Sequence, residues 1–288
     1  MENLRGIGLM ILAMACFTTG DMFLKLASER LATGEILVIM GIGGAAIFWI
    51  WLAQSGQVLV GRDLWHWAII IRTLSEMIGT IGMITALVLA DFTSVASITQ
   101  AMPLVVTLGA ALLLREAVGW RRWAAILVGF CGVLIIIRPG LQGFDTNALW
   151  AVLAVFGLGF RDLFSRPVPK SISTLRIAAI GFLSLIPTGL ILIPFGPDPV
   201  TPTLIEWGQL TMMIALTAIG YYAVTSAMRM GDVAVIAPFR YSRLIFALAV
   251  GVVVFGDRPD AYTLIGAAIT VLAGIYVFLR EADVKRAS

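Results

Sequence analysis

The chain has 288 residues, of which 60% are hydrophobic and only 13% are charged, and its mean hydropathy is +0.98. A soluble domain carries about 25% charged residues, so this composition excludes an ordinary soluble protein and indicates one embedded in a lipid bilayer. The pI near 9.1 does not indicate a nucleic-acid partner, because the chain holds only three lysines and its net charge of +3 is explained by membrane topology.

Hydropathy along the chain predicts ten helical spans, each near the ~20 residues that cross the core of a bilayer. The predicted spans are 6–27, 34–54, 66–89, 93–114, 121–138, 147–165, 174–195, 207–228, 233–255 and 261–279. The segments between them are short, and none is long enough to fold as a soluble domain. The predicted fold class is therefore an all-α polytopic membrane protein.

Acidic residues recur in the chain at a constant spacing of 141 residues. The pairs are Asp21 and Asp162, Asp91 and Asp232, and Glu116 and Asp257. A charge inside an apolar segment is costly, so the repetition of several at one spacing indicates an internal repeat. We predict two five-helix repeats, 1–141 and 142–288. Because five is an odd number, the second copy inserts inverted relative to the first.

Basic residues are distributed unevenly between the two ends of the predicted spans. Both termini and the even-numbered loops carry twelve: Arg5, Arg62, Arg115, Arg121, Arg122, Arg166, Lys170, Arg176, Arg229, Arg280, Lys285 and Arg286. The odd-numbered loops carry four: Lys25, Arg30, Arg138 and Arg258. Since Lys and Arg accumulate in cytoplasmic loops, both termini are predicted to be cytoplasmic, in a bacterial-type inner (plasma) membrane.

A recurring pattern closes each predicted repeat. Ala90–Gly140 reads ADFTSVASITQAMPLVVTLGAALLLREAVGWRRWAAILVGFCGVLIIIRPG. It combines a small-residue-rich helix, a mid-helix proline, an acidic residue at the helix exit and a Gly-rich helix. Gly231–Phe278 repeats the pattern with Asp257 in place of Glu116. The pattern resembles the end of an EamA domain. Two such domains resemble the ten-span drug/metabolite transporter (DMT) superfamily, which includes YddG-type amino-acid exporters.

This resemblance implies a secondary transporter whose central cavity is lined by spans 1, 3, 4, 6, 8 and 9, with spans 5 and 10 at the periphery. The second copy departs from the pattern, because Leu244 stands where the first copy has Pro103, and Pro238 lies earlier. Proline breaks a helix, so we expect the kink in the ninth span to lie nearer the start of its span than the kink in the fourth.

Other function classes lack their sequence signatures. The chain contains no G-x-x-x-x-G-K-[ST] loop for ATP. One histidine, His66, and two separated cysteines, Cys16 and Cys131, are too few for a metal-ligand cluster. An intramembrane enzyme would need a nucleophile beside a base, and His66 stands between two tryptophans at a predicted membrane interface. We therefore predict no enzymatic activity, no metal and no cofactor.

Ionisable residues inside the spans are the candidate binding groups, because each costs at least ~2.5–3.5 kcal/mol at the centre of a membrane helix. Arg72 and Glu76 share a face of the third span, with Glu76 roughly 14 Å deep. Arg240 and Arg243 lie three residues apart in the ninth span and need an acidic partner or a substrate carboxylate. The predicted substrate-binding or cavity residues are Arg240, Arg243, Tyr241, Arg72, Glu76 and Tyr221.

Asp21 and Asp162 occupy equivalent places in the two repeats, toward the outer end of the first span and the inner end of the sixth. They are the predicted gate residues. Glu76 and Asp21 are the predicted candidates for proton coupling. The opposing interpretation is a uniporter in which Glu76 only pairs with Arg72 as a structural ion pair.

These observations together predict an inner-membrane secondary transporter that works by alternating access. Its predicted cargo is an amino acid, the aromatic ones included, or a related small amphiphilic metabolite, and its predicted direction is export. The direction rests on the resemblance alone. The alternatives are an uptake carrier for a cofactor-like solute such as riboflavin or S-adenosylmethionine, and a passive channel or uniporter. Protons are the candidate coupling ion, and the oligomeric state is left open.

Overall fold

The computed structural model describes residues 2–57, 61–115, 119–139, 145–169, 171–229 and 233–287. Within these ranges all regular structure is helical, which confirms the predicted all-α class. Nine segments of the described chain are long and apolar enough to cross a membrane, and α7, with 17 residues, is slightly shorter than they are. Two of the acidic residues that mark the repeat, Glu116 and Asp232, lie outside the described residues.

The helices follow the ten predicted spans closely. The first five spans are α1 (Glu2–Ala27), α2 (Thr33–Gln54), α3 (Trp67–Leu89), α4 (Phe92–Thr99) with α5 (Met102–Leu112), and α6 (Trp120–Ile137). The second five are α7 (Ala148–Phe164), α8 (Thr174–Leu192), α9 (Leu204–Arg229), α10 (Val233–Ile236) with η3 (Ala237–Tyr241) and α11 (Ser242–Val254), and α12 (Ala261–Ala287). Short 3₁₀ turns, η1 (Arg62–Trp65) and η2 (Ile193–Phe195), flank α3 and α8.

The fourth and ninth spans are both interrupted, and proline explains each interruption. Pro103 lies in the first turn of α5 and has no N–H to donate to the carbonyl of Thr99, where α4 ends. Pro238 lies in the first turn of η3, directly after α10. The break in the ninth span begins after Ile236, whereas its equivalent in the fourth span comes after Thr99. The predicted shift of the kink toward the start of the ninth span is confirmed.

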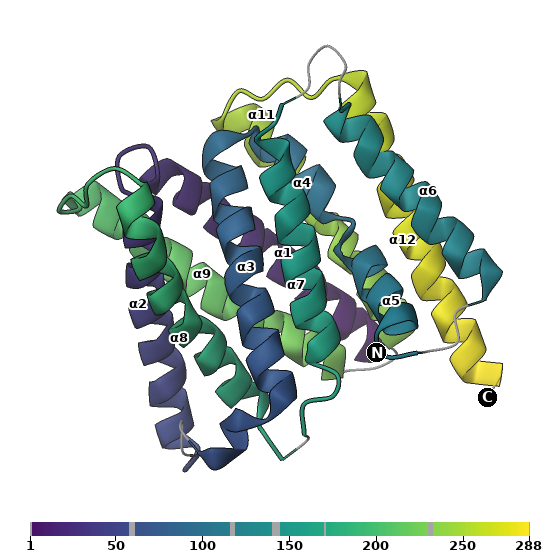
Figure 1. Cartoon of the computed structure of the whole chain (residues 1–288), viewed down its shortest axis with the longest axis horizontal. Coiled ribbons are helices and arrows are strands. Elements are labelled where there is room, and N and C mark those ends of the chain that lie inside the picture. The colour runs from purple at the N-terminus through teal and green to yellow at the C-terminus, as the bar shows by residue number, and fades with distance from the viewer. Residues whose placement is uncertain are drawn as a thin grey trace.

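The largest helix contacts follow a two-fold pattern. They join α1 with α9, α3 with α7, α2 with α8 and α6 with α12. In the two predicted repeats α1 corresponds to α7, α2 to α8, α3 to α9 and α6 to α12. Exchanging the repeats therefore converts the α1–α9 pair into the α7–α3 pair, and it leaves the α2–α8 and α6–α12 pairs unchanged. In Figure 1 the α2–α8 pair forms one edge of the bundle and the α6–α12 pair forms the opposite edge. This is the arrangement that two related five-helix halves would produce.

Glycine sets the distance between α3 and α7. A Cβ atom on Gly157 would lie 2.4 Å from the backbone of Gly79, and one on Gly79 would lie 2.5 Å from the backbone nitrogen of Leu158. Small residues let membrane helices approach closely enough for their backbones to touch. The two helices that carry most of the buried charge are therefore held in direct backbone contact.

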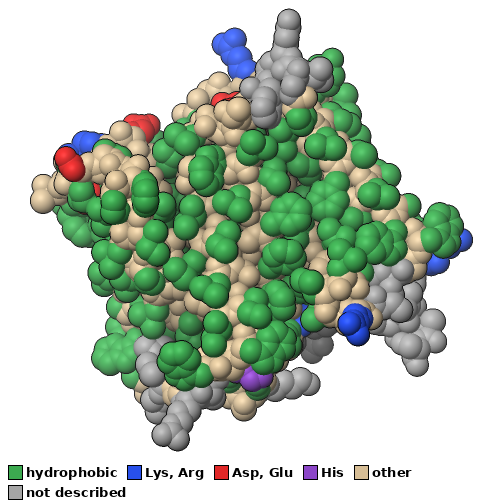
Figure 2. Space-filling view, viewed as in Figure 1, with side chains coloured by type: hydrophobic (Ala, Val, Ile, Leu, Met, Phe, Trp, Pro, Cys, Tyr) green, Lys and Arg blue, Asp and Glu red, His purple; other side chains and the backbone are tan. Residues whose placement is uncertain are grey.

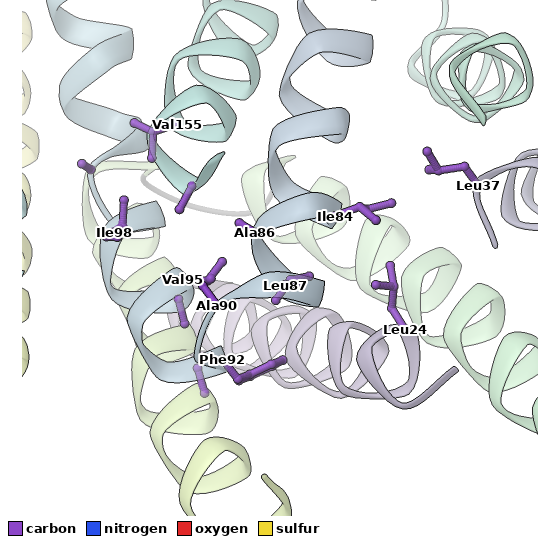
Figure 3. Packing of buried hydrophobic residues seen from close by; sticks show 14 of the residues in the cluster. Leu24, Leu37, Ile84, Ala86, Leu87, Ala90, Phe92, Val95, Ile98 and Val155 are labelled. Carbon is purple, nitrogen blue, oxygen red and sulfur yellow. The ribbon is translucent and has the colours of Figure 1, made fainter. Parts of the chain in front are cut away.

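The apolar core joins helices of both predicted repeats. Figure 3 shows Leu24 of α1, Leu87 of α3, Phe92 of α4 and Val155 of α7 among its members. Each of these four side chains is at most 4% exposed. Because lipid tails are as apolar as leucine, such a core is held by close packing rather than by exclusion of water.

The outer surface is apolar where lipid would contact it. Figure 2 shows hydrophobic side chains spread over the viewed face, with charged side chains at its margins. Large apolar side chains such as Trp49, Leu127 and Leu272 are 57%, 63% and 66% exposed. A continuous apolar surface of this kind is a liability in water and is covered by the hydrocarbon core in a bilayer.

The glycine contact predicts a sharp packing effect. In Gly157→Val the added side chain would overlap the Gly79 backbone, and overpacking typically costs ~1–3 kcal/mol. We expect the apparent melting temperature of the detergent-purified protein, followed by the loss of its monodisperse chromatography peak, to fall by about 2–12 °C. The matched control is Gly208→Val, because a Cβ atom on Gly208 meets nothing within 4 Å. Equal melting of Gly157→Val and wild type would contradict the backbone contact.

Candidate functional site

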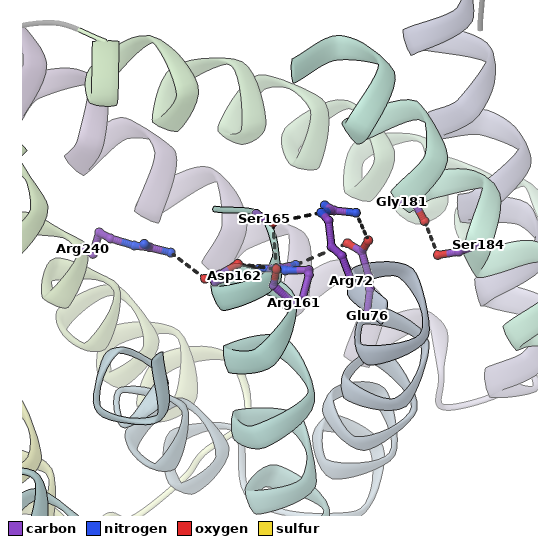
Figure 4. A network of polar contacts seen from close by, with 8 residues as sticks. All are labelled: Arg72, Glu76, Arg161, Asp162, Ser165, Gly181, Ser184 and Arg240. Carbon is purple, nitrogen blue, oxygen red and sulfur yellow. Dashed lines mark hydrogen bonds and ion pairs between the residues drawn. The ribbon is translucent and has the colours of Figure 1, made fainter. Parts of the chain in front are cut away.

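An ionic network lies between α3 and α7. Arg72 Nη1 donates to Glu76 Oε2 at 2.9 Å, and Arg161 Nη1 lies 3.4 Å from Glu76 Oε1. Arg161 also binds Asp162 Oδ1, at 2.9 Å through Nε and 2.8 Å through Nη2. Ser165 accepts a hydrogen bond from Arg72 Nε at 3.0 Å and donates one to the Arg161 carbonyl. Figure 4 shows these side chains converging from the two helices.

Arg240 extends the network from the broken ninth span. It lies in η3, and its Nη2 atom is 3.8 Å from Asp162 Oδ2, too far for a hydrogen bond. Its side chain is 40% exposed, whereas that of Arg72 is 7% exposed. Arg240 is therefore the least tightly paired arginine of the network, and the break in the helix places it at the edge of the network (Figure 4).

A second ion pair links the two predicted halves at the other end of the bundle. Arg243 Nη2 in α11 lies 2.5 Å from Asp21 Oδ2 in α1. A cavity of about 10 Å³ adjoins the pair, which is room for about one water molecule. Its walls are Thr18, Asp21, Met83, Leu87, Phe92, Ala96, Arg243 and Ala247. The close pair and the small cavity show that the helices are tightly closed here.

Further hydrogen bonds hold the helices together at this same end of the bundle. Lys25 Nζ at the end of α1 donates to the Ala90 carbonyl at 2.6 Å, and Asp257 Oδ2 accepts from the backbone N–H of Thr93 at 2.8 Å, at the start of α4. Burial, together with the nearby Asp257 carboxylate, raises the pKa of Asp91, which stands in the turn between α3 and α4. Residues from α1, α4 and the loop after α11 thus meet at one end of the bundle.

The charges of the two clusters do not cancel. The arginines are Arg72, Arg161, Arg240 and Arg243, and the acids are Asp21, Glu76 and Asp162. Four positive groups and three negative groups leave one positive charge. A buried charge is stable only when it is paired or hydrated, and Arg240, whose side chain is 40% exposed, is the member of the clusters most accessible to a further anionic partner.

An apolar cavity of about 240 Å³ lies between α2, α8 and α9. We call it the aromatic pocket. Its walls are Phe48, Trp51, Gln57, Ser173, Thr174, Leu175, Tyr221, Tyr222, Thr225 and Ser226. Tyr221 also lies within electrostatic range of Arg72, Glu76, Arg161 and Asp162. The pocket and the ionic network are therefore neighbours that share Tyr221.

The structure brings together four of the residues selected from the sequence, namely Arg72, Glu76, Asp162 and Arg240. The acidic partner that Arg243 was expected to need is Asp21, whereas the acidic neighbour of Arg240 is Asp162. Among the described residues, no group of three or more His, Cys, Asp or Glu side chains could hold a metal ion.

Tyr241 joins neither cluster. It packs edge-to-face on Phe278 of α12, and its hydroxyl lies where a Cβ atom of Gly274 would be. The hydroxyl is buried and has no hydrogen-bond partner among the described residues. Its predicted contact with substrate has no support in this geometry.

Sequence reasoning missed Arg161. Its neighbour Asp162 was selected because it lies 141 residues after Asp21. Arg161 has no charged counterpart in the first repeat, because the residue equivalent to it there is Gly20. Consecutive helical residues do not normally face each other, so the reach of Arg161 to both Asp162 and Glu76 depends on the contact between α3 and α7. An unpaired arginine one turn from the end of a predicted span was the available signal.

Comparison with known proteins places the chain in a family. The model of the EamA-like transporter family matches residues 4–138 and again residues 146–280. The chain belongs to the EamA-like transporter family, as its sequence pattern predicted, and it is a multi-pass membrane transporter rather than an enzyme. A crystal structure of a protein 18% identical over 96% of this chain and 97% of its own shares the fold, with a TM-score of 0.61.

Several curated relatives cover nearly the whole chain or a large part of it. The S-adenosylmethionine uptake transporter of Rickettsia bellii is 25% identical over 96% of this chain and 94% of its own. The pseudopaline exporter CntI of Pseudomonas aeruginosa is 24% identical over 94% of each chain. The riboflavin transporter of Vibrio cholerae is 31% identical over 64% of this chain and 61% of its own. The relatives differ in both cargo and direction, so export of amino acids stays a prediction.

Proposed function

We propose that this transporter carries a small metabolite of the amino-acid type, and that Arg240 receives its carboxylate. The observation that carries the proposal is the state of Arg240, which is 40% exposed and lies 3.8 Å from its acidic neighbour. Arginine binds carboxylates through two parallel hydrogen bonds. A carboxylate there would also neutralise the one positive charge that the two clusters leave over.

The relatives support two versions of this cargo. Export of an amino acid, an aromatic one included, is our first version, and a pseudopaline exporter is among the relatives. Uptake of S-adenosylmethionine is the second, favoured by relatives that span 96% of this chain. S-adenosylmethionine carries an amino-acid head, so both versions present a carboxylate to Arg240. Riboflavin has none, and its transport would not use this residue.

We propose that alternating access uses the two aspartates that the repeat makes equivalent. Asp21 and Asp162 lie in α1 and α7, and each has an arginine of the ninth span as its partner, Arg243 and Arg240. We propose that the Asp21–Arg243 pair closes the outer gate and the Asp162–Arg240 pair closes the inner gate. The first is tight at 2.5 Å and the second loose at 3.8 Å, so the inner gate is the less firmly closed.

In the proposed orientation both termini are cytoplasmic, in a bacterial-type inner membrane. The twelve-to-four distribution of basic residues supports this orientation. The two repeats, 1–141 and 142–288, would then be inverted five-helix halves that rock about the cavity between them. Their two-fold pattern of contacts supports this motion, because related contacts can be made and broken alternately.

The carboxylate proposal predicts a selective loss in Arg240→Gln. Losing a hydrogen-bonded charge pair costs ~1.5–3 kcal/mol, so the KM for L-phenylalanine or S-adenosylmethionine should rise at least about tenfold. Transport of phenethylamine and of decarboxylated S-adenosylmethionine, which lack the carboxylate, should change less than twofold. Tracer flux into liposomes measures both. Arg258→Gln, in an exposed loop, is the matched control. An unchanged preference between acid and amine in correctly inserted Arg240→Gln would refute the role of Arg240.

We further propose that Glu76 is the proton-coupling residue, with Asp21 as the next candidate. Glu76 is held between Arg72 and Arg161, so a movement of α7 relative to α3 would separate its carboxylate from one of these two arginines. In liposomes with an imposed pH gradient and no substrate gradient, wild type should accumulate substrate and Glu76→Gln should only equilibrate it. Glu29→Gln is the exposed control.

Two results would contradict this assignment. If wild type shows no uphill accumulation, the protein is a uniporter and Glu76 is part of a structural ion pair. If uphill transport persists in Glu76→Gln, the coupling residue lies elsewhere, and Asp21→Asn is the next variant to measure.

A further inference from the structure

The aromatic pocket has the composition of a binding site, and it lies outside the ion pairs of the network and of the proposed gates. Among its ten lining residues none is charged. Four of them are aromatic, and five carry a hydroxyl or amide group as well as an aliphatic body. A largely apolar cavity with a few converging polar groups is the usual form of a small-molecule site.

The aromatic side chains form one continuous cluster, in which the rings of Phe48 and Trp51 stack with their centroids 6.3 Å apart. Phe48 of α2 is fully buried, stacks on Phe182 at 5.3 Å and meets the edge of Tyr221 at 5.5 Å. Trp51 of α2 and Tyr222 of α9 lie 5.2 Å apart and are tilted by 40°. Tyr222 is 54% exposed, so this part of the cluster is open toward the surroundings. An aromatic face that the cluster leaves free can stack with an offset on a flat ring.

Polar groups gather at the end of the pocket where α2 and α9 finish and α8 begins. Ser173 Oγ donates to Gln57 Oε1 at 2.5 Å. Thr225 and Ser226 of α9 line the same cavity. These hydroxyl and amide groups both donate and accept hydrogen bonds, so they match the heteroatoms at the edge of a ring. A fully ionised group would find no counter-charge among the lining residues.

The pocket adjoins the network at the end remote from Arg240. Gly181 of α8 brings its backbone against Glu76, since a Cβ atom there would lie 2.9 Å from Glu76 Oε2. The next residue, Phe182, stacks on Phe48 of the pocket wall. Figure 4 shows Arg240 and Glu76 at opposite ends of the chain of ion pairs. A ligand in the aromatic pocket therefore lies on the Glu76 side of the network, although Glu76 does not line the pocket, and it does not need Arg240.

We infer that the aromatic pocket binds the planar, uncharged aromatic ring of a solute. Its volume of about 240 Å³ is below the ~300–1,000 Å³ of pockets that enclose whole drug-sized ligands, so it accommodates a ring system rather than a complete larger metabolite. The aromatic walls recognise the faces of the ring, and the hydroxyl and amide groups recognise its edge. The inference does not rest on the proposed role of Arg240.

Ring-bearing and ring-free probes test this site by equilibrium dialysis with the purified full-length protein. The planar probes are adenosine, tryptophol and lumichrome, and ribose is the ring-free counterpart of adenosine. We expect at least one planar probe to bind and ribose not to bind. Trp51→Ala and Tyr222→Ala should weaken that binding at least tenfold. Trp49→Ala is the matched control, because Trp49 lies on the same helix and is 57% exposed.

The outcomes separate this site from the carboxylate site. Arg240→Gln should bind the planar probe as tightly as wild type, even though it loses carboxylate transport. Failure of all three probes to bind would overturn the inference, as would wild-type affinity in both pocket variants. Displacement of the probe by decanol at equal concentration would show that the pocket binds acyl chains, and this result would also overturn the inference. If Trp51→Ala does not insert, Tyr222→Ala decides, because its half-exposed side chain can be removed without opening the core.

Discussion

The cost of charge in a membrane governs the centre of this protein. Each ionised group needs a partner or water, and the two clusters hold four arginines and three acids within ten helical spans. Three of the arginines have an acidic neighbour at 2.9 Å or less. The fourth, Arg240, is only loosely paired. On the basis of this imbalance we propose Arg240 as the residue that receives an anionic cargo.

The broken helices make this arrangement possible. A straight ninth span would place Arg240 and Arg243 on one face, three residues apart. With η3 inserted, Arg240 turns toward Asp162 of one half and Arg243 toward Asp21 of the other. The repeat supplies two equivalent aspartates, and the ninth span supplies an arginine for each. A small change in the break could therefore tighten one pair while loosening the other, which is the event that alternating access requires.

Much of the fold followed from the sequence, because hydropathy and proline act locally. The predicted second span, 34–54, corresponds to α2 (Thr33–Gln54), and Pro238 marked the early break in the ninth span. The cost of buried charge also selected Glu76 and Arg240 as candidate binding residues, and the structure places both in the ionic network. The reach of Arg161 to Glu76 and the aromatic pocket could not be predicted, because they depend on contacts between helices far apart in the chain.

The opposition of the two gates can be measured directly by spin-label distances in a cysteine-free background. Labels at Glu29 and Arg258 report the outer gate, and labels at Arg5 and Ser171 report the inner gate. In Asp21→Asn, which removes the partner of Arg243, we predict that the outer distance lengthens while the inner distance shortens. Distances that stay unchanged, or that lengthen together at both ends, would contradict gates that open and close in opposition.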